Sequence, residues 1–124
     1  MILIDTNIFV DHLRNYASAV RFFESIAGRE NVIFSAITET ELLVGRVNED
    51  NIKRDKRIHF LHQWNKKVID NAVSVLAGDI SRKYGLAVPD AIIASTAILN
   101  NAELVTKNVK DFRKVPDLKV RTPY

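Results

Sequence analysis

The feature that most constrains the fold of this chain is the alternation of short apolar runs with longer segments of helical character. Residues 2–4 and 32–34 form apolar runs too short for helices, which is typical of buried strands, and similar runs occupy residues 67–69, 103–106 and 118–121. A helix is expected after residue 5, and helical spacing or helix start and stop signals mark residues 17–27, 38–44, 52–66, 72–84 and 89–100. Strands that alternate with helices need crossover connections. The pattern therefore predicts an α/β fold, with a mainly parallel sheet of four or five strands between two helical layers.

Length and composition narrow the class of protein further. The chain has 124 residues, 47% of them hydrophobic, so we expect a single domain over residues 1–124 with an ordinary core. The absence of cysteine excludes disulfides, thiolate zinc sites and a cysteine nucleophile. No apolar run approaches the roughly 20 residues that span a bilayer, and we expect a cytoplasmic protein without membrane contact.

Four carboxylates follow the expected strands closely. Asp5 ends the first strand, and Glu41 is expected in the first turn of the helix after the second strand. Asp90 opens the helix that begins at Pro89, and Asp111 follows the strand that ends near residue 106. Ligands of open α/β sheets bind outside the carboxyl ends of the strands. We therefore expect these four side chains to converge on one edge of the sheet.

Local structural roles also explain three of these carboxylates. Thr38 and Glu41 match a capping box, Asp90 complements a helix N-terminus, and Asn108 with Asp111 matches another cap. Asp5 is harder to explain, because a carboxylate that closes a buried strand is costly without compensation. Four carboxylates within ~5 Å repel by about 3 kcal/mol per pair at an effective dielectric of 20, which a divalent cation relieves. An oxygen donor set favours Mg²⁺ or Mn²⁺ over zinc.

These residues carry a resemblance to a known family. Residues 5–7 (DTN), 35–45 (SAITETELLVG), 89–94 (PDAIIA) and 104–112 (LVTKNVKDF) occur in the order and at the intervals of a PIN-domain ribonuclease of the VapC toxin type. The resemblance spans essentially the whole chain. It implies a PIN-like three-layer α/β/α sandwich and hydrolysis of RNA phosphodiester bonds with Mg²⁺ or Mn²⁺, one or two ions.

The resemblance also implies roles for individual residues. Asp5, Glu41 and Asp90 would be the family's acidic triad, and Asp111 an outer or second-site ligand. The remaining expected lining residues are polar: Thr6, Asn7, Thr106 and Asn108. The chain departs from the family at Asn108, where many members carry Asp. The expected partners are RNA, a cognate antitoxin protein whose arginine enters near the triad, and a second copy of the chain in a homodimer.

Other functions fit some of the same residues. A phosphatase of the haloacid dehalogenase type would need Asp at residue 7, which is Asn7 here. A PIN-fold nuclease of RNA maturation, and a non-catalytic PIN-like module that binds RNA or protein, remain alternatives to the toxin.

A basic segment supplies candidate RNA contacts. Seven basic and three acidic residues lie between Arg46 and Lys67, a local excess of +4 in a chain of net charge +3. This segment either attracts phosphate or is a solvated helix face. The expected RNA contacts are Arg46, Lys53, Arg54, Lys56, Arg57, Lys107 and Lys110.

The same region carries two patterns with a structural alternative. His59 and His62 have the spacing of a metal pair, but surface or phosphate contacts are the favoured interpretation, and packing is favoured for His12. The apolar residues Ile58, Leu61 and Trp64 are either core or the seam of a homodimer.

Overall fold

A five-stranded parallel sheet with strand order β3-β2-β1-β4-β5 forms the centre of the molecule. The structure is a computed structural model that describes all 124 residues. Its strands are β1 (Ile2–Ile4), β2 (Val32–Ser35), β3 (Asn65–Lys67), β4 (Glu103–Val105) and β5 (Val120–Arg121). All four strand pairings are parallel. The carboxyl ends of the strands therefore lie along one edge, as the sequence pattern predicts.

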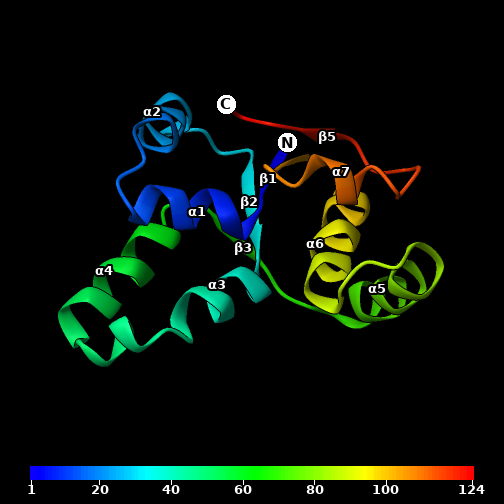
Figure 1. Cartoon of the computed structure of the whole chain (residues 1–124), viewed down its shortest axis with the longest axis horizontal. Helices are drawn as coiled ribbons and strands as arrows, with labels where there is room; N and C mark the ends of the chain where they lie inside the picture. The colour runs from blue at the N-terminus through cyan, green and yellow to red at the C-terminus, as the bar shows by residue number, and fades with distance from the viewer.

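Helices cover both faces of the sheet, which confirms the three-layer prediction. Figure 1 shows α1 (Thr6–Leu13), α2 (Ala17–Ile26) and α4 (Asn51–Leu61) on one side, and α5 (Asn71–Tyr84) and α6 (Val88–Leu99) on the other. The chain reaches α4 through α3 (Ala36–Leu43) and a 3-10 turn, η1 (Arg46–Glu49). A short helix, α7 (Val109–Phe112), separates β4 from β5. None of the helices is both long and apolar enough to cross a bilayer.

Alternating side chains of the strands divide the core into two parts. Ile2 and Ile4 of β1 pack with the aromatic residues of α1, α2 and α4, whereas Leu3 points to the opposite face. There the core contains the small side chains of α6, including Ala91 and Ala94, which are fully buried. The three central strands β1, β2 and β4 are therefore covered on both faces, which explains their continuous apolar runs.

Two adjacent elements, α4 and β3, differ clearly from their predicted bounds. The helix expected over 52–66 ends at Leu61, and the strand expected over 67–69 lies at Asn65–Lys67, because β3 pairs there with Ile33–Ser35 of β2. Val68, which carries the apolar signal of the predicted strand, is 66% exposed. Leu61 and Trp64 are buried in the protein's own core, so the core interpretation of that stripe is confirmed for these two residues.

Candidate active site

Three of the four predicted carboxylates line one groove at the carboxyl edge of the sheet. Asp5 directly follows β1, Glu41 lies in α3 after β2, and Asp90 lies in the first turn of α6. They share the walls of a cavity of about 390 Å³. Glu41 occupies the second turn of α3 rather than the first, because that helix begins at Ala36, two residues earlier than expected. Three residues distant in sequence thus meet at one site.

Asp5 is the most buried of these carboxylates, with 5% of its surface exposed. Its Oδ1 accepts a hydrogen bond from the backbone amide of Thr6 at 2.8 Å, and its Oδ2 accepts one from the Thr106 hydroxyl at 2.7 Å. Burial raises the pKa of Asp5 to about 6, against the two hydrogen bonds and with a further contribution from the charges of Asp90 and Glu41. No basic side chain pairs with Asp5. Glu41 and Asp90 also take part in none of the protein's ion pairs.

A pair of threonine hydroxyls orients Glu41. The hydroxyl of Thr6 donates to Glu41 Oε1 at 2.8 Å, and the hydroxyls of Thr6 and Thr38 lie 2.9 Å apart. Because Thr6 has one hydroxyl proton and gives it to Glu41, Thr38 is the donor at the second contact. The predicted capping box at Thr38 and Glu41 is wrong, since Ser35 caps α3 by accepting from the Ile37 amide at 3.2 Å. Thr38 is buried, and its hydroxyl bonds to the Thr6 hydroxyl that in turn binds Glu41. The capping-box pattern had assigned Thr38 another role.

Asp90 connects the groove to a second, smaller hollow. The pKa of Asp90 is raised by burial and by the charges of Glu41 and Asp111. Asp111 does not line the groove of Asp5 but a neighbouring hollow of about 250 Å³, which Asp90 also lines. Its Oδ1 lies 3.7 Å from Nζ of Lys114, and the pair is half-exposed. This position agrees with an outer role for Asp111.

The expected polar lining residues fall on the groove to different degrees. Asn7 and Asn108 line it, and Asn7 Oδ1 is buried without a hydrogen-bond partner. The Asn108 side chain does not cap α7, so the predicted second cap is wrong; instead, its backbone amide donates to Thr106 Oγ1 at 2.9 Å. Thr106 contributes to the site through the hydrogen bond that its hydroxyl donates to Asp5.

The donor set fits a hard divalent cation. The groove offers carboxylate and amide oxygens, the ligands that suit Mg²⁺ and Mn²⁺. No three acidic or histidine side chains come close enough to form a closed metal-binding group. An open arrangement suits Mg²⁺, which keeps several waters and is commonly bound by one or two carboxylates together with substrate phosphate. The unpartnered Asn7 oxygen adds a further potential ligand.

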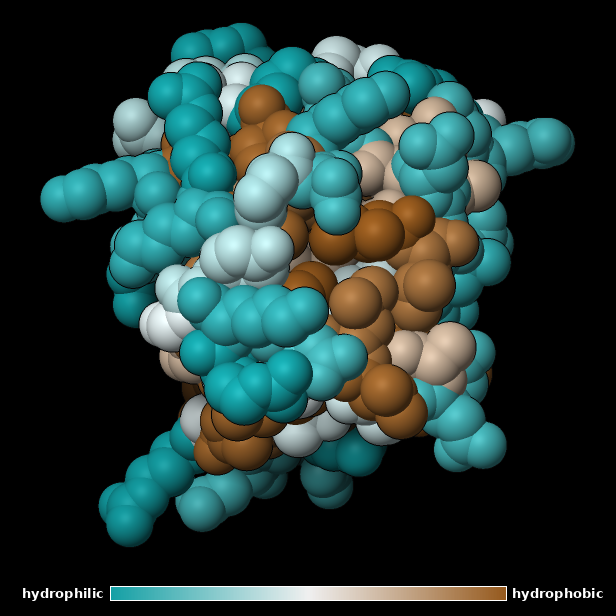
Figure 2. All heavy atoms as spheres, turned by 90° about the vertical axis from the view of Figure 1, so that its right-hand side faces the viewer, coloured by the Kyte–Doolittle hydropathy of each residue, from teal (hydrophilic) through white to brown (hydrophobic).

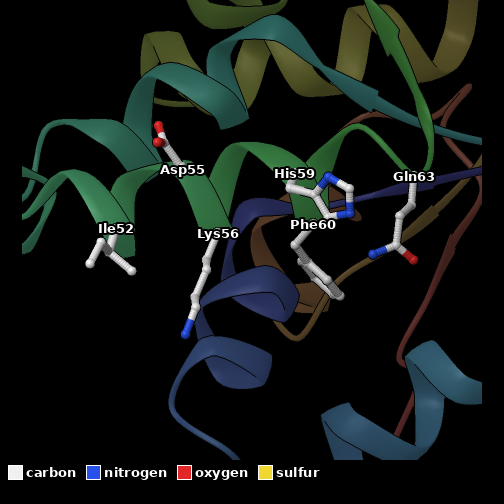
Figure 3. Close-up of a pocket in the computed structure, with 6 residues that line it drawn as sticks. All are labelled: Ile52, Asp55, Lys56, His59, Phe60 and Gln63. Carbon is white, nitrogen blue, oxygen red and sulfur yellow. The ribbon is translucent and has the colours of Figure 1, made fainter.

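The largest hollow in the molecule lies elsewhere, on the outer side of α4. Its volume is about 540 Å³, and Figure 3 shows Lys56 and Phe60 extending to one side of the helix while Asp55 points to the other. It shares no lining residue with the acidic groove. We place the candidate active site in the smaller groove because only the groove gathers several carboxylates that lack cationic partners.

Two of the expected RNA contacts make hydrogen bonds within the protein. Arg57 Nη1 donates to the carbonyl oxygen of Leu42 at 3.2 Å, and Lys107 Nζ donates to Asp11 Oδ2 at 2.8 Å. The remaining basic residues, Arg46, Lys53, Arg54, Lys56 and Lys110, are exposed, and Arg54 lies 3.9 Å from Asp55 in an ion pair. Their contact with RNA stays a prediction.

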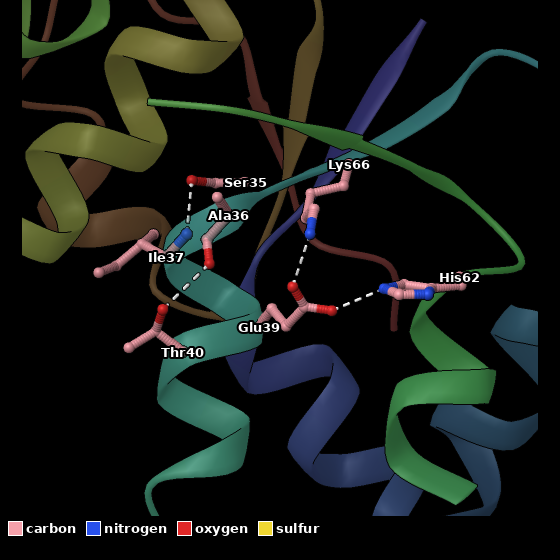
Figure 4. A network of polar contacts seen from close by, with 7 residues as sticks. All are labelled: Ser35, Ala36, Ile37, Glu39, Thr40, His62 and Lys66. Atoms are coloured by element: carbon pink, nitrogen blue, oxygen red, sulfur yellow. Dashed lines mark hydrogen bonds and ion pairs between the residues drawn. The ribbon is translucent and has the colours of Figure 1, made fainter. Parts of the chain in front are cut away.

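None of the three histidines lines the groove. His12 stacks on Phe60 with ring centroids 4.1 Å apart, and burial lowers its pKa. His62 Nε2 lies 2.7 Å from Glu39 Oε1, and Lys66 Nζ donates to the other carboxylate oxygen at 2.8 Å (Figure 4). Packing of His12 is confirmed, and His62 belongs to an ion-pair network rather than to a metal site.

Most of one wall of the groove was absent from the sequence prediction, which named Asn7 but not Val10, Asp11 or Arg14. Asn7, Val10, Asp11 and Arg14 all line it from α1 and the residue that follows α1. Their spacing of three, four and seven residues places them on one face of a helix. A helical projection from Asp5 could have identified this wall, since Asp5 caps α1.

Comparisons with known proteins identify the family of the chain. The PIN domain family matches residues 2–118. Ribonuclease VapC19 of Mycobacterium tuberculosis is 35% identical over 130 residues, which cover 100% of both chains. Ribonuclease VapC of Rickettsia bellii is 27% identical, covering 98% of this chain and 95% of its own. The chain therefore belongs to the PIN-domain family, in its VapC group, as the four sequence motifs indicated.

Solved structures match the fold over nearly the full length. A toxin–antitoxin complex from Klebsiella pneumoniae superposes with a TM-score of 0.82 at 32% identity, covering 100% of this chain and 98% of the other. VapBC2 from Rickettsia felis, bound to a DNA fragment from the promoter, gives a TM-score of 0.79 at 27% identity, with 98% of both chains covered. The parallel sheet and its helical layers are thus those of the VapC structures.

Proposed function

We propose that this protein is a Mg²⁺- or Mn²⁺-dependent endoribonuclease and the toxin of a toxin–antitoxin pair. The observation that carries the proposal is the groove in which Asp5, Glu41 and Asp90 meet without a cationic partner. The VapC relatives are named ribonucleases, which supports RNA as the substrate class. We place the protein in the cytoplasm, where such a substrate is available.

The residues of the groove have distinct roles in this proposal. Asp5, Glu41 and Asp90 hold one or two ions, and Asp111 adds charge from the neighbouring hollow. Thr106 and Thr6 each occupy one carboxylate oxygen, of Asp5 and Glu41 respectively. This restricts the rotation of both carboxylates and directs their remaining coordination toward the groove. A bound divalent ion would lower the pKa of a water molecule and offset charge on the phosphate during hydrolysis.

RNA cleavage by the purified protein tests this proposal. The wild type should cleave single-stranded RNA in Mg²⁺ or Mn²⁺ and stop when EDTA is added, and Asp5→Asn should abolish cleavage. The matched control is Asp79→Asn, which removes an exposed carboxylate that is paired with Arg82 on α5 and does not line the groove. Cleavage by Asp5→Asn at the wild-type rate would place the active centre elsewhere.

An antitoxin partner is the second part of the proposal. One structural neighbour is a toxin–antitoxin complex. Another is VapBC2 bound to a DNA fragment from the promoter. A cluster of carboxylates is complementary to a guanidinium, which makes two parallel charge-assisted bonds. We therefore propose that an arginine of the antitoxin enters near Asp5, Glu41 and Asp90 and competes with the metal.

Two measurements test the antitoxin. Co-expression of the neighbouring antitoxin gene should rescue growth when the toxin is induced. Rising Mn²⁺ at constant ionic strength should weaken antitoxin binding in calorimetry, because both bind the same oxygens. An affinity independent of Mn²⁺ would move inhibition away from the groove, and induced expression that is harmless while cleavage is active would contradict the toxin assignment.

A homodimer is the third part, and its candidate surface lies on α5 and α6. Figure 2 shows apolar side chains gathered across the face that carries these helices. Val75 and Val88 are 69% and 61% exposed, and a hollow of about 410 Å³ is lined by Ile69, Val88 and Ile92. Large exposed apolar patches mark interaction sites. Light scattering should give the mass of a dimer for the wild type and of a monomer for Ile69→Glu; a monomeric wild type would refute the dimer.

A further inference from the structure

The acidic groove continues along α1, beyond the carboxylates, to the turn between α1 and α2. Asn7, Val10, Asp11 and Arg14 form its wall, and Asp5 stands at the other end. Nine residues at 1.5 Å per residue put the Asp5 and Arg14 backbones about 14 Å apart. The cavity is thus longer than one phosphate group, and its far end has a different chemistry from its acidic end.

Arg14 brings a positive charge to the far end of the groove. It is exposed and takes part in none of the ion pairs. Asp11, three residues earlier, is its nearest acidic neighbour in sequence, but Asp11 Oδ2 accepts from Lys107 Nζ at 2.8 Å and from the Tyr124 hydroxyl at 2.7 Å. Although burial raises the pKa of Asp11, these partners and the charge of Arg14 hold it below its ordinary value. Asp11 thus has two donors other than Arg14, and the Arg14 guanidinium can bind an anion in the groove.

An exposed aromatic residue follows this cation two positions later in the chain. Asn15 adopts a left-handed conformation with φ 60°, which ends α1 and turns the chain toward α2. The next residue, Tyr16, is 51% exposed. Its ring is supported by Tyr124, at a centroid distance of 5.6 Å, and by Lys107 Nζ, 5.5 Å from its centroid. About half of the Tyr16 surface is open to solvent, while Tyr124 and Lys107 pack against the ring.

We propose that Arg14 and Tyr16 form a subsite for a nucleotide that flanks the cleaved bond in single-stranded RNA. Arg14 binds the phosphate of that nucleotide and Tyr16 stacks on its base, a combination that proteins use for single strands. The subsite rests on the proposed ribonuclease function. Because the Arg14 backbone lies about 14 Å along the helix from Asp5, its guanidinium is assigned to the neighbouring phosphate and not to the reacting one. The subsite is then expected to contribute to RNA affinity and not to the chemical step.

Binding and kinetics of single variants test the subsite. In an Asp5→Asn background, anisotropy with labelled single-stranded RNA should show weaker binding after Arg14→Ala, with the slope of log affinity against log salt reduced by about 0.7. Tyr16→Ala should weaken binding at least about fivefold and leave the salt slope unchanged, because stacking is neutral. Tyr16→Phe should restore binding, since the ring is kept. In the active protein, Arg14→Ala and Tyr16→Ala should raise KM and leave kcat unchanged.

The matched control is Arg29→Ala. Arg29 is also exposed, but it lies before β2, at the opposite edge of the sheet, where its Nε donates to Asn31 Oδ1. Affinity and KM of the Arg14 and Tyr16 variants equal to those of this control would overturn the subsite while wild-type cleavage upheld the ribonuclease. A loss in kcat, or a Tyr16→Phe variant as weak as Tyr16→Ala, would also overturn it. Absence of metal-dependent cleavage by the wild type would instead refute the underlying function.

Discussion

Two glutamates of α3, only two residues apart, occupy opposite electrostatic surroundings. Glu39 sits between Lys66 of β3 and His62 at the end of α4 (Figure 4), and these partners hold its pKa below its ordinary value although burial raises it. Glu41 faces the groove, where its only side-chain donor is the hydroxyl of Thr6 and its neighbours include Asp5 and Asp90. One carboxylate has its cations built into the fold, and the other has none.

This difference separates a structural charge from a functional one. A carboxylate that stabilises the fold is paired by the chain itself, as Glu39 is. A cluster that lacks such pairs destabilises the metal-free fold, because its members repel and are poorly solvated. Such a cost persists at sites where a ligand or a metal supplies the missing charge. The contrast between Glu39 and the groove therefore supports the assignment of the groove as the site of chemistry.

The largest expected effect is on catalysis. Glu41→Gln should reduce the initial rate of RNA cleavage in Mn²⁺ by more than ~100-fold, since the loss of an outer partner of a metal site already costs about 10–100-fold. Glu39→Gln should change the rate by less than about threefold, because Glu39 does not line the groove. Comparable losses in two folded variants would remove the distinction between the two glutamates.

The second effect concerns stability and pH. The pKa of Asp5 is raised from 3.8 to about 6, so the unfolded state releases this proton at lower pH than the folded state does. As the pH rises from about 4 to about 6, the free energy of unfolding of the metal-free protein should therefore fall by roughly 3 kcal/mol, which corresponds to a shift of about two pKa units. Asp5→Asn lacks this loss and should be the more stable protein at pH 7.5.

Urea unfolding of EDTA-treated protein at pH 4 and pH 7.5 measures the difference. Mn²⁺ should then stabilise the wild type more than Asp5→Asn, because the ion binds the folded carboxylates. Equal stability of the two proteins at both pH values would contradict the conclusion that ionised Asp5 destabilises the metal-free fold.

The third effect has the opposite sign. The pKa of Glu39 is lowered in the folded state, so its contribution is present above the ordinary pKa and is lost as pH falls through the folded one. Glu39→Gln should destabilise the protein by about 1 kcal/mol at pH 7.5, as expected for a partly exposed ion pair, and the effect should disappear once the pH lies below the folded pKa of Glu39. If Glu39→Gln stabilised the protein at pH 7.5, ionised Glu39 would destabilise the fold as ionised Asp5 does.

The smallest effect separates the two uncertain ligands. Asp111→Ala should weaken Mn²⁺ binding by about fivefold, because it removes a charge that acts on Asp90 through space from a half-exposed position. Asn108→Ala should weaken it less, since its side chain is neutral. Calorimetric titration with Mn²⁺ compares the two, and the reverse order would make Asn108 the closer ligand.

The sequence by itself determined the class of fold and the position of the acidic edge. Short apolar runs and helical periodicity are local properties, and strands that alternate with helices allow few arrangements other than a parallel sheet. Asp5 and Asp90 could be assigned to the carboxyl edge because each lies next to an element boundary that the sequence marks. Gly85, with φ 72°, likewise ends α5 where the sequence predicted it.

Only the tertiary structure decided which polar residues act together. Thr38 was assigned to a cap because Glu41 follows it at the right spacing, but its hydroxyl partner is Thr6, 32 residues away. Asp111 and Asp5 line two different hollows, and Asp90 lines both. Asp11 pairs with Lys107, 96 residues away, and not with Arg14, which is only three residues away. Hydrogen bonds and charges act over a few ångströms between residues remote in the chain, so a sequence pattern records the groups and the fold alone selects their partners.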